Sequence, residues 1–272
     1  MISRFFTVVT TTYNRADILP SAIESVLNQS YRYFEYLVID NGSTDHTHDV
    51  IRSFKDSRLR YVKNPFPTSS CDAPRNLGIQ LAQGEWLAFL DDDDRWYPSK
   101  LDYVKKSIDQ HPNITVICHH EHKKIYGHLY GIVRCGPWTE NFYEKLLYEG
   151  NCLSPSATVI KTDVLRKMNG FQLGKEIDGA ADYELWLRLA KDHYYFYFVD
   201  EVLGECHLNQ NNETFKNRYM GLKTARFVRQ HILEYEKKYF YRISKKGIWR
   251  ILKLYLIGLR SLIMGSSYEA VD

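Results

Sequence analysis

The stretch GEWLAFLDDDDRWYPSKL, residues 84–101, places four consecutive carboxylates directly after an apolar run. The run has the composition of a buried strand, and Asp91–Asp94 follow its end. Like charges a few ångströms apart repel one another, and removing them from water costs further free energy. We therefore expect a positive partner here, either a divalent metal ion or basic side chains. Taken alone, the four residues have a plainer explanation, a solvated turn that caps a helix beginning near Pro98.

The preceding sequence alternates between strand and helix patterns. The runs FFTVVTT, YFEYLVID and LRYVKN are rich in strand formers, and the segments between them carry apolar residues at helical spacing. This alternation predicts an α/β fold, with a mostly parallel sheet and helices on both faces. In such folds, ligands bind beyond the carboxyl ends of the strands. Three polar stretches fall at that edge: TTTYNR (10–15), DNGSTD (40–45) and DDDD (91–94).

Each stretch alone has a structural explanation, because Asn-Gly is a common turn and Ser-Thr-Asp a common helix cap. Together, and in this order, the stretches indicate a nucleotide site with a metal ion. Mg²⁺ and Mn²⁺ prefer carboxylate oxygens, and Mg²⁺ usually takes one or two carboxylates together with substrate phosphates. The acidic run therefore predicts a divalent cation, Mn²⁺ or Mg²⁺, as the cofactor.

Residues 5–101 resemble the nucleotide-binding half of family 2 glycosyltransferases, which have the GT-A fold. The resemblance lies in VVTTTYNRADILPSAIESVLNQSY, FEYLVIDNGSTDHT and APRNLGIQLAQGEWLAFLDDDDRWYPSKL, and continues in LRKMNGFQLGKEIDGAADYELWLRLA at 165–190. It implies a Rossmann-like GT-A domain over residues 1–215, followed by a basic helical segment, 216–272. Within the domain, 1–110 would bind the nucleotide-sugar and 111–215 the acceptor.

The same resemblance implies an inverting, metal-dependent transfer of sugar from a nucleoside-diphosphate sugar, here a UDP-sugar. The acceptor would be a glycan or a lipid-linked glycan in cell-surface polysaccharide biosynthesis. Family roles carry over to this chain by position. Asp93 and Asp91 match the metal-binding D-x-D, and His207 falls where a further metal or diphosphate ligand can lie. The nucleotide-sugar would be held by Thr11, Tyr13, Asp40, Asn41, Arg75, Asp91 and Asp92.

The general base would be Asp182 in AADYELWLRLA, which aligns with the residue that deprotonates the acceptor hydroxyl. This chain departs from the family pattern at two places: Asn41 stands where an Asp is frequent, and Ala181 where a Glu is frequent. The first departure weakens the assignment of the base as uracil. The alternative for Asp182 is a structural charge at a helix N-terminus, stabilised by the helix dipole.

Two other functions share these features. A nucleotidyltransferase has the same fold class and metal, but it normally has a glycine-rich basic phosphate loop, which TTTYNRAD lacks. A non-catalytic nucleotide-sugar-binding or scaffold protein is disfavoured because the acidic residues are all present. The cluster HHEH at 119–122 looks like a metal site, yet the family pattern has no ligand there, so a structural or solvated role is expected.

The C-terminal part is strongly basic. Residues 216–260 hold thirteen Lys or Arg and two Glu, although the whole chain has a net charge of only +3. In SKKGIWRILKLYLIGLRSLIMG (244–265), helical spacing places a cationic stripe opposite an apolar arc. The predicted stripe is Lys246, Arg250, Lys253 and Arg260, and the predicted arc is Ile251, Leu252, Tyr255, Leu259 and Leu262.

This pattern predicts that residues 245–264 lie on an anionic membrane surface with the basic side toward the headgroups. The alternative is a helix packed on the catalytic domain with a basic outer face. Nucleic acid is not expected as a partner, since no binding motif accompanies the charge. The five cysteines lack CxxC spacing and fit a reducing compartment. MISRFFTVVT has the pattern of a strand and not of a signal peptide. A cytoplasmic protein, peripheral on the inner face of the cytoplasmic membrane, is expected.

Overall fold

The computed structural model describes residues 5–137, 141–208, 219–240 and 243–264. The chain divides into two compact units, each assembled from separate segments. The first, here called the sheet unit, comprises Met1–Trp138, Cys152–Phe171 and Asp192–Leu208. The second, here called the helical unit, comprises Thr139–Asn151, Gln172–Lys191 and Asn209–Asp272.

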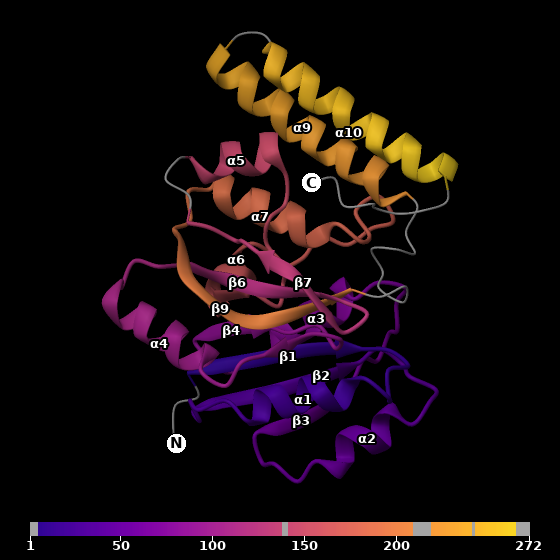
Figure 1. The fold of residues 1–272 in the computed structure, drawn as a ribbon, viewed down its shortest axis with the longest axis vertical. Helices are drawn as coiled ribbons and strands as arrows, with labels where there is room; N and C mark the ends of the chain where they lie inside the picture. The colour runs from indigo at the N-terminus through magenta and orange to yellow at the C-terminus, as the bar shows by residue number, and fades with distance from the viewer. Residues whose placement is uncertain (1–4, 138–140, 209–218, 241–242, 265–272) are drawn as a thin grey trace. The chain divides into compact units, whose positions relative to one another are not determined.

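The sheet unit contains a nine-stranded sheet in the order β3-β2-β1-β4-β8-β6-β9-β5, with β7 paired to β6 (Figure 1). Neighbours among the first four strands of the chain pair in parallel, and β8 joins them antiparallel to β4. The strands are β1 (Phe6–Thr12), β2 (Phe34–Asp40), β3 (Leu59–Lys63), β4 (Trp86–Phe89), β5 (Arg95–Trp96), β6 (Val116–Ile125), β7 (His128–Val133), β8 (Thr158–Lys161) and β9 (Phe196–Leu208).

The helices of this unit connect the strands, as the alternating pattern predicted. The α/β fold with an additional C-terminal helical part is confirmed. The helices are α1 (Leu19–Leu27), α2 (Thr47–Ser53), α3 (Asp72–Leu81), α4 (Lys100–Gln110) and α6 (Thr162–Lys167).

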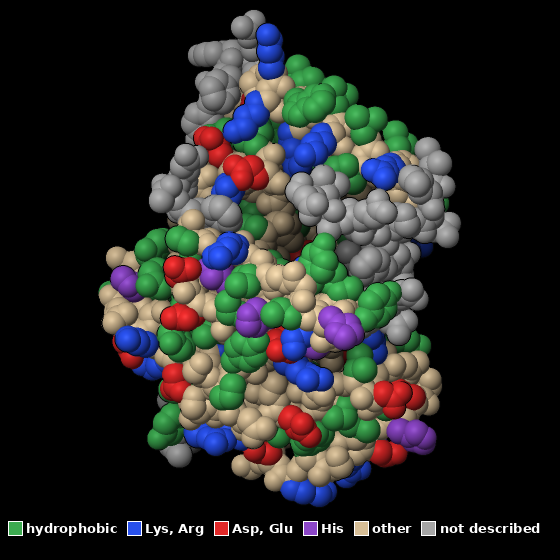
Figure 2. All heavy atoms as spheres, in the orientation of Figure 1, with side chains coloured by type: hydrophobic (Ala, Val, Ile, Leu, Met, Phe, Trp, Pro, Cys, Tyr) green, Lys and Arg blue, Asp and Glu red, His purple; other side chains and the backbone are tan. Residues whose placement is uncertain are grey.

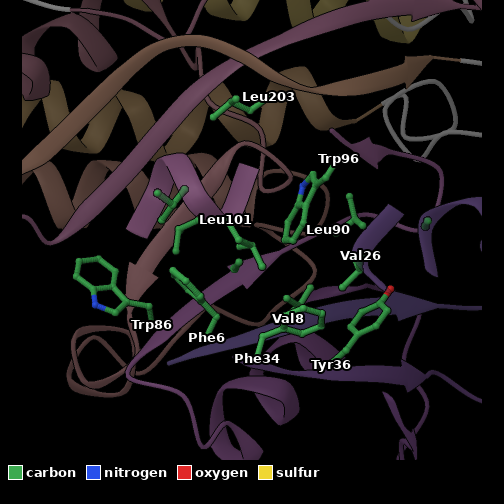
Figure 3. Close-up of a cluster of buried hydrophobic side chains, with 14 of the residues drawn as sticks. Phe6, Val8, Val26, Phe34, Tyr36, Trp86, Leu90, Trp96, Leu101 and Leu203 are labelled. Carbon is green, nitrogen blue, oxygen red and sulfur yellow. The ribbon is translucent and has the colours of Figure 1, made fainter. Parts of the chain in front are cut away.

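Adjacent residues of β1 show how helices cover both faces of the sheet. Val8 belongs to a buried cluster with Val26 of α1 and Leu101 of α4 (Figure 3). Val9 points to the other face, because successive side chains of a strand alternate. There it meets α3 at Gly78, where an added Cβ would lie only 2.6 Å from Val9 Cγ1. The glycine thus lets α3 approach the sheet closely and positions its N-terminal half near the carboxyl ends of the strands.

The helical unit consists of α5 (Phe142–Glu149), α7 (Ala181–Lys191), α9 (Met220–Phe240) and α10 (Lys245–Met264). Helices α9 and α10 form an antiparallel pair. They touch where Gly258 faces Gly221, since a Cβ on Gly258 would lie 2.9 Å from the Gly221 carbonyl carbon. At the other end, Glu236 of α9 accepts hydrogen bonds from both the backbone and the hydroxyl of Ser244, each at 2.6 Å.

The orientation of α10 contradicts the predicted cationic stripe at one position. Arg250 is buried, and its Nε donates a 3.1 Å hydrogen bond to the carbonyl of Leu147, in the last turn of α5. Carbonyls at a helix C-terminus lack partners within the helix, so a guanidinium group is a suitable donor. Leu252 and Leu259, predicted on the opposite arc, are 52% and 46% exposed and lie on the outer face. No helix in the described ranges combines the length and apolarity needed to cross a bilayer.

Candidate active site

The four carboxylates Asp91–Asp94, here called the acidic loop, follow β4 at the carboxyl edge of the parallel strands. Asp94 is buried, and the side chain of Asp93 is only 12% exposed. Burial raises the pKa of Asp92 to about 6, although Arg15 opposes this shift. Burial and the neighbouring carboxylates raise the pKa of Asp93 to about 7. Ionising this loop in the absence of a cation is therefore unfavourable.

Two arginines supply part of the positive charge that the sequence predicts. Arg75 of α3 is buried and forms an ion pair with Asp91, and its other nitrogen lies 3.5 Å from Asp72. Arg15, in the loop after β1, lies 3.9 Å from Asp93. Two guanidinium groups cannot balance four carboxylates. The remaining negative charge and its all-oxygen donors suit a hard divalent ion such as Mn²⁺ or Mg²⁺.

Ser156, just before β8, holds the acidic loop from the adjacent strand. Its Oγ accepts a 3.0 Å hydrogen bond from the Asp91 N–H and donates one of 2.6 Å to Asp94 Oδ2. The second carboxylate oxygen of Asp94 accepts the N–H of His207 at 2.8 Å. Ser156 and His207 of β9 thereby hold the two ends of the loop by hydrogen bonds. This restricts the directions in which the side chains of Asp92 and Asp93 can point.

A buried lysine forms a hydrogen bond with the backbone of Ser156. Lys100, at the start of α4, donates a 2.8 Å hydrogen bond to the Ser156 carbonyl and lies 3.3 Å from the ring centre of Trp96. The indole N–H of Trp96 donates to the same carbonyl at 2.9 Å. Glu121 of β6 is also buried, and burial raises its pKa to about 7. Lys100 and Trp96 thus hold the backbone of Ser156, whose side chain contacts the acidic loop.

Asp40 and Asn41, predicted to bind the nucleotide, hold the loops around the site in place. Asp40 accepts hydrogen bonds from the N–H of Ser43 at 2.8 Å and from the hydroxyl of Tyr61 at 2.9 Å. The amide of Asn41 donates to the Thr68 carbonyl at 2.7 Å and accepts from the Asn64 side chain at 2.9 Å. Both side chains are buried, and their polar atoms are occupied by these partners.

Thr11 and Tyr13 occupy the end of β1 and the loop that follows. Thr11 is buried, whereas Tyr13 is 54% exposed and presents a ring of the kind that stacks on a nucleobase. Between Tyr13 and Arg15, Asn14 adopts a left-handed backbone conformation, with φ of 51°. Its N–H donates to Ser43 Oγ at 2.9 Å, and its side chain accepts from the Thr44 N–H at 2.8 Å. The loops after β1 and β2 are therefore joined.

Asp182 lies in the helical unit, in the first turn of α7. It is partly exposed, and Asn151 Nδ2 lies 3.3 Å from its Oδ2. The other acid of that turn, Glu184, is buried and accepts two hydrogen bonds from Arg188 Nε. Of these two carboxylates, only Asp182 combines partial exposure with a position at the helix N-terminus.

The histidines have identifiable structural partners. His207 Nε2 lies 3.0 Å from Glu205, so the imidazole now contacts a carboxylate of its own strand. In HHEH, His120 Nε2 lies 3.0 Å from Asp200, and His122 Nδ1 contacts the hydroxyl of Tyr97. Within the described ranges, no three His, Cys, Asp or Glu side chains form a ready-made metal site.

Residues 7–168 match the sequence profile of glycosyl transferase family 2. This range contains the loops after β1 and β2, Arg75, the acidic loop and Ser156. The chain belongs to glycosyl transferase family 2. A protein of Rickettsia felis, named only as an uncharacterized glycosyltransferase, is 32% identical over 78% of this chain. The chain spans only about a third of that relative's length, since the match covers 35% of it.

Two relatives of more similar length come from Escherichia coli. WcaA, provisionally named a colanic acid biosynthesis glycosyl transferase, is 28% identical over 92% of each chain. WfgD is named a UDP-Glc:alpha-D-GlcNAc-diphosphoundecaprenol beta-1,3-glucosyltransferase. It is 31% identical over 68% of this chain and 70% of its own.

Solved structures show the same GT-A fold at low sequence identity. Staphylococcus aureus TarS (residues 1–349), in complex with UDP-GlcNAc, is 15% identical with a TM-score of 0.64, covering 95% of this chain and 81% of TarS. The mannosyltransferase PcManGT from Pyrobaculum calidifontis, in complex with GDP-Man and Mn²⁺, is 18% identical with a TM-score of 0.62. The match covers 95% of this chain and 72% of PcManGT.

Several residues that shape this family 2 site were not singled out from the sequence. Arg15 lies within TTTYNR, after the first strand. Its positive charge is the only feature of the sequence that could have identified it as a partner of the acidic loop. Ser156 and Lys100 carry no signal of their own, because they meet the acidic loop through β8 and α4. Asp94 was identified only as part of the acidic run, whereas in the structure it is the carboxylate that anchors the loop.

Proposed function

We propose that this chain is an inverting, metal-dependent glycosyltransferase that uses a nucleoside-diphosphate sugar, a UDP-sugar, as donor. The acceptor is a glycan or a lipid-linked glycan in cell-surface polysaccharide biosynthesis. The observation that carries the proposal is the acidic loop, which gathers four carboxyl groups beside only two arginines at the carboxyl edge of the parallel strands. The names of WcaA and WfgD, and the UDP-GlcNAc complex of TarS, support the pathway and the donor class.

In the proposed donor site, Asp93 and Asp91 hold Mn²⁺ or Mg²⁺ together with the diphosphate. When bound, the ion offsets the charge that develops on the leaving nucleoside diphosphate. Arg75 keeps Asp91 oriented and faces the diphosphate, and Asp92 contacts the ribose. His207 is an auxiliary ligand of the ion or the diphosphate, which requires its imidazole to leave Glu205. The Mn²⁺ complex of PcManGT supports the choice of ion.

The nucleoside would lie against the joined loops after β1 and β2. Thr11 and Tyr13 contact the base and ribose, with the exposed ring of Tyr13 as the stacking surface. Asp40 and Asn41 contribute by ordering the loop segments that frame the base, since their side chains are bound to Tyr61, Ser43 and residues 64–68. The indirect role of Asn41 explains why an amide is suitable at this position.

In the proposed reaction, Asp182 accepts the proton of the acceptor hydroxyl as the acceptor oxygen attacks the anomeric carbon. The bond from that carbon to the diphosphate oxygen breaks at the same time, and the diphosphate leaves with the electron pair. A single displacement inverts the configuration, so an α-linked donor gives a β-glycoside. The partial exposure of Asp182, and the commitment of Glu184 to Arg188, support this assignment.

We also propose that the enzyme acts at the inner face of the cytoplasmic membrane as a peripheral protein. A lipid-linked acceptor would be held at that surface, and the name of WfgD includes a diphosphoundecaprenol-linked substrate. The basic C-terminal segment supports this location, because anionic lipids attract clustered Lys and Arg side chains.

The proposal is tested by thermal unfolding with UDP, GDP and their sugars, with Mn²⁺ or with EDTA, followed by assays of turnover. A glycosyltransferase is expected to be stabilised by one nucleoside diphosphate only when metal is present, and to release that diphosphate from the matching sugar donor. Binding without release with any acceptor tested would favour a non-catalytic protein. Release of pyrophosphate from a nucleoside triphosphate and a sugar phosphate would identify a nucleotidyltransferase.

A further inference from the structure

The outer face of α10 is apolar, although this helix belongs to the most basic part of the chain. Five large side chains are exposed along it, and at about 100° per residue they lie within an arc of about 100°. We call them the outer stripe of α10. They are Trp249 (66% exposed), Leu256 (62%), Leu252 (52%), Ile248 (47%) and Leu259 (46%).

The contacts of α10 within the helical unit determine which side chains face outward. The buried face carries Gly247, Arg250, Leu254 and Gly258. Gly247 packs against Glu236, where an added Cβ would lie 2.4 Å from Oε1, and Gly258 packs against Gly221. With Arg250 bound to the Leu147 carbonyl, these contacts fix the rotation of the helix. The outer stripe is therefore held in the exposed position by specific packing.

Basic side chains border the outer stripe. Lys246, Lys253 and Arg260 are exposed and follow the stripe along one edge, about 20° to 60° from Trp249 around the helix axis. Helix α10 contains five Lys or Arg and no Asp or Glu. Figure 2 shows hydrophobic and basic side chains over α9 and α10.

We propose that this face of α10 lies in the headgroup region of an anionic phospholipid bilayer. The outer stripe enters the boundary of the acyl chains, while Lys246, Lys253 and Arg260 extend to the lipid phosphates. A Trp in such a stripe suits the interface, where its ring is apolar and its N–H can reach water. This inference rests on the proposed function only in placing the enzyme at a membrane. It differs from the binding mode predicted for the cationic stripe, because inserted apolar side chains make the main contact with the lipid.

Charge favours a bilayer over a second copy of the chain as the occupant. An isologous contact between two α10 helices would place Lys253 and Arg260 of each copy near those of the other, and like charges across an interface are unfavourable. Anionic lipid instead complements the basic edge along its whole length.

The test measures sedimentation of the full chain with vesicles, without nucleotide or metal. The vesicles contain either phosphatidylcholine alone or equal parts of phosphatidylcholine and phosphatidylglycerol. The first variant replaces Trp249, Leu252 and Leu256 with Ser, and the second replaces Lys246, Lys253 and Arg260 with Gln. A matched control replaces Leu129 and Tyr130 with Ser, which are exposed on β7 of the sheet unit.

Wild type and the β7 control are expected to bind the anionic vesicles, and high salt should weaken that binding. The Ser variant should lose at least about tenfold in partition coefficient at every salt concentration, and the Gln variant chiefly at low salt. Trp138 lies outside the described residues and is replaced by Phe in both proteins of a quenching experiment. Brominated lipids should then quench the fluorescence of the protein that keeps Trp249 and not that of Trp249→Phe, because Trp86, Trp96 and Trp186 are buried. Far-UV circular dichroism checks that each variant is folded.

Three results would overturn the inference: wild type remains in the supernatant, the Ser variant sediments like wild type, or the Ser variant converts a wild-type dimer into a monomer without any lipid effect. Transfer to a short water-soluble acceptor is measured in parallel. Vesicle binding without transfer would refute the proposed function and leave this inference intact, and transfer without vesicle binding would do the reverse.

Discussion

The hydroxyl of Ser156 donates a 2.6 Å hydrogen bond to the buried carboxylate of Asp94. The same oxygen accepts the N–H of Asp91, so one side chain before β8 contacts both ends of the acidic loop. The two carboxylates between them, Asp92 and Asp93, are therefore presented by a loop whose ends are fixed.

Replacing Ser156 with Ala should weaken metal binding more than it weakens the fold. Ser154→Ala is the matched control, because Ser154 also donates to a buried carboxylate, that of Glu121, but has no hydrogen bond to the acidic loop. Each variant should lose about 1–3 kcal/mol of unfolding free energy. Only Ser156→Ala should raise the Mn²⁺ concentration required for UDP binding, measured by calorimetry. Equal metal affinities in the two variants would show that Ser156 has a purely structural role.

Asp93→Asn should abolish the metal-dependent stabilisation by UDP. A ligand that binds only the folded state stabilises it by about 2.7 kcal/mol at a hundredfold excess over Kd. That gain, measured by thermal unfolding with Mn²⁺, should disappear in the variant, and sugar transfer should be lost. If UDP stabilises wild type equally with Mn²⁺ and with EDTA, and EDTA leaves transfer intact, Asp93 is not a metal ligand.

Asp182→Asn should remove the general base while keeping the shape of the side chain. UDP binding should stay nearly unchanged, and kcat should fall by roughly 10² to 10⁴-fold, which is the usual contribution of general acid–base catalysis. Glu184→Gln serves as the control, since it should lower stability through the loss of its pairing with Arg188 and affect kcat much less. Full activity of Asp182→Asn would place the base at another residue.

The carboxyls of Asp92 and Asp93 should make the metal-free protein less stable as the pH rises from about 4 to 7. Burial raises the pKa values of Asp92 to about 6 and Asp93 to about 7, so the folded state binds more protons than the unfolded state in this range. The free energy of unfolding then falls with pH, with a slope approaching about 1.4 kcal/mol per pH unit for each such carboxyl.

Saturating Mn²⁺ with UDP should reverse much of this loss, because a cation favours the ionised carboxylates. Urea unfolding at several pH values checks both effects. Asp93→Asn supplies the comparison, since it should flatten the metal-free pH profile. Identical metal-free pH profiles in wild type and in Asp93→Asn would contradict the raised pKa of Asp93, because other titrating groups are common to both proteins.

The local sequence was sufficient to predict the strands and helices around the site. Strand β1 is rich in β-branched residues, α1 has a Pro in its first turn, and the polar loops follow parallel strands whose ends must meet. The position of the acidic loop could therefore be predicted from the chain order, whereas Arg75 was assigned to the site from the family resemblance. The ion pair between Arg75 and Asp91 was not itself predicted.

Other features depend on pairings that no local pattern specifies. Ser156 reaches the acidic loop because β8 enters the sheet antiparallel to β4, and Ser154 and Ser156 are indistinguishable in sequence. In α10, apolar residues occur on nearly every side, so periodicity could not decide which face is buried. Arg250 was assigned to the outer face for this reason, whereas its hydrogen bond to the Leu147 carbonyl holds it inside.

If α10 binds a membrane as proposed, the contact between Gly221 and Gly258 determines which face of this helix meets the lipid. A Cβ at Gly258 would lie 2.7 Å from the backbone nitrogen of Leu222, so a larger residue must push α10 away or roll it about its axis. Rolling by one residue's spacing, about 100°, would bury part of the outer stripe and bring charges into its place. Mutations at these glycines are expected to leave catalysis intact and to abolish membrane localisation. In a cell, the active enzyme would then no longer meet a membrane-held acceptor.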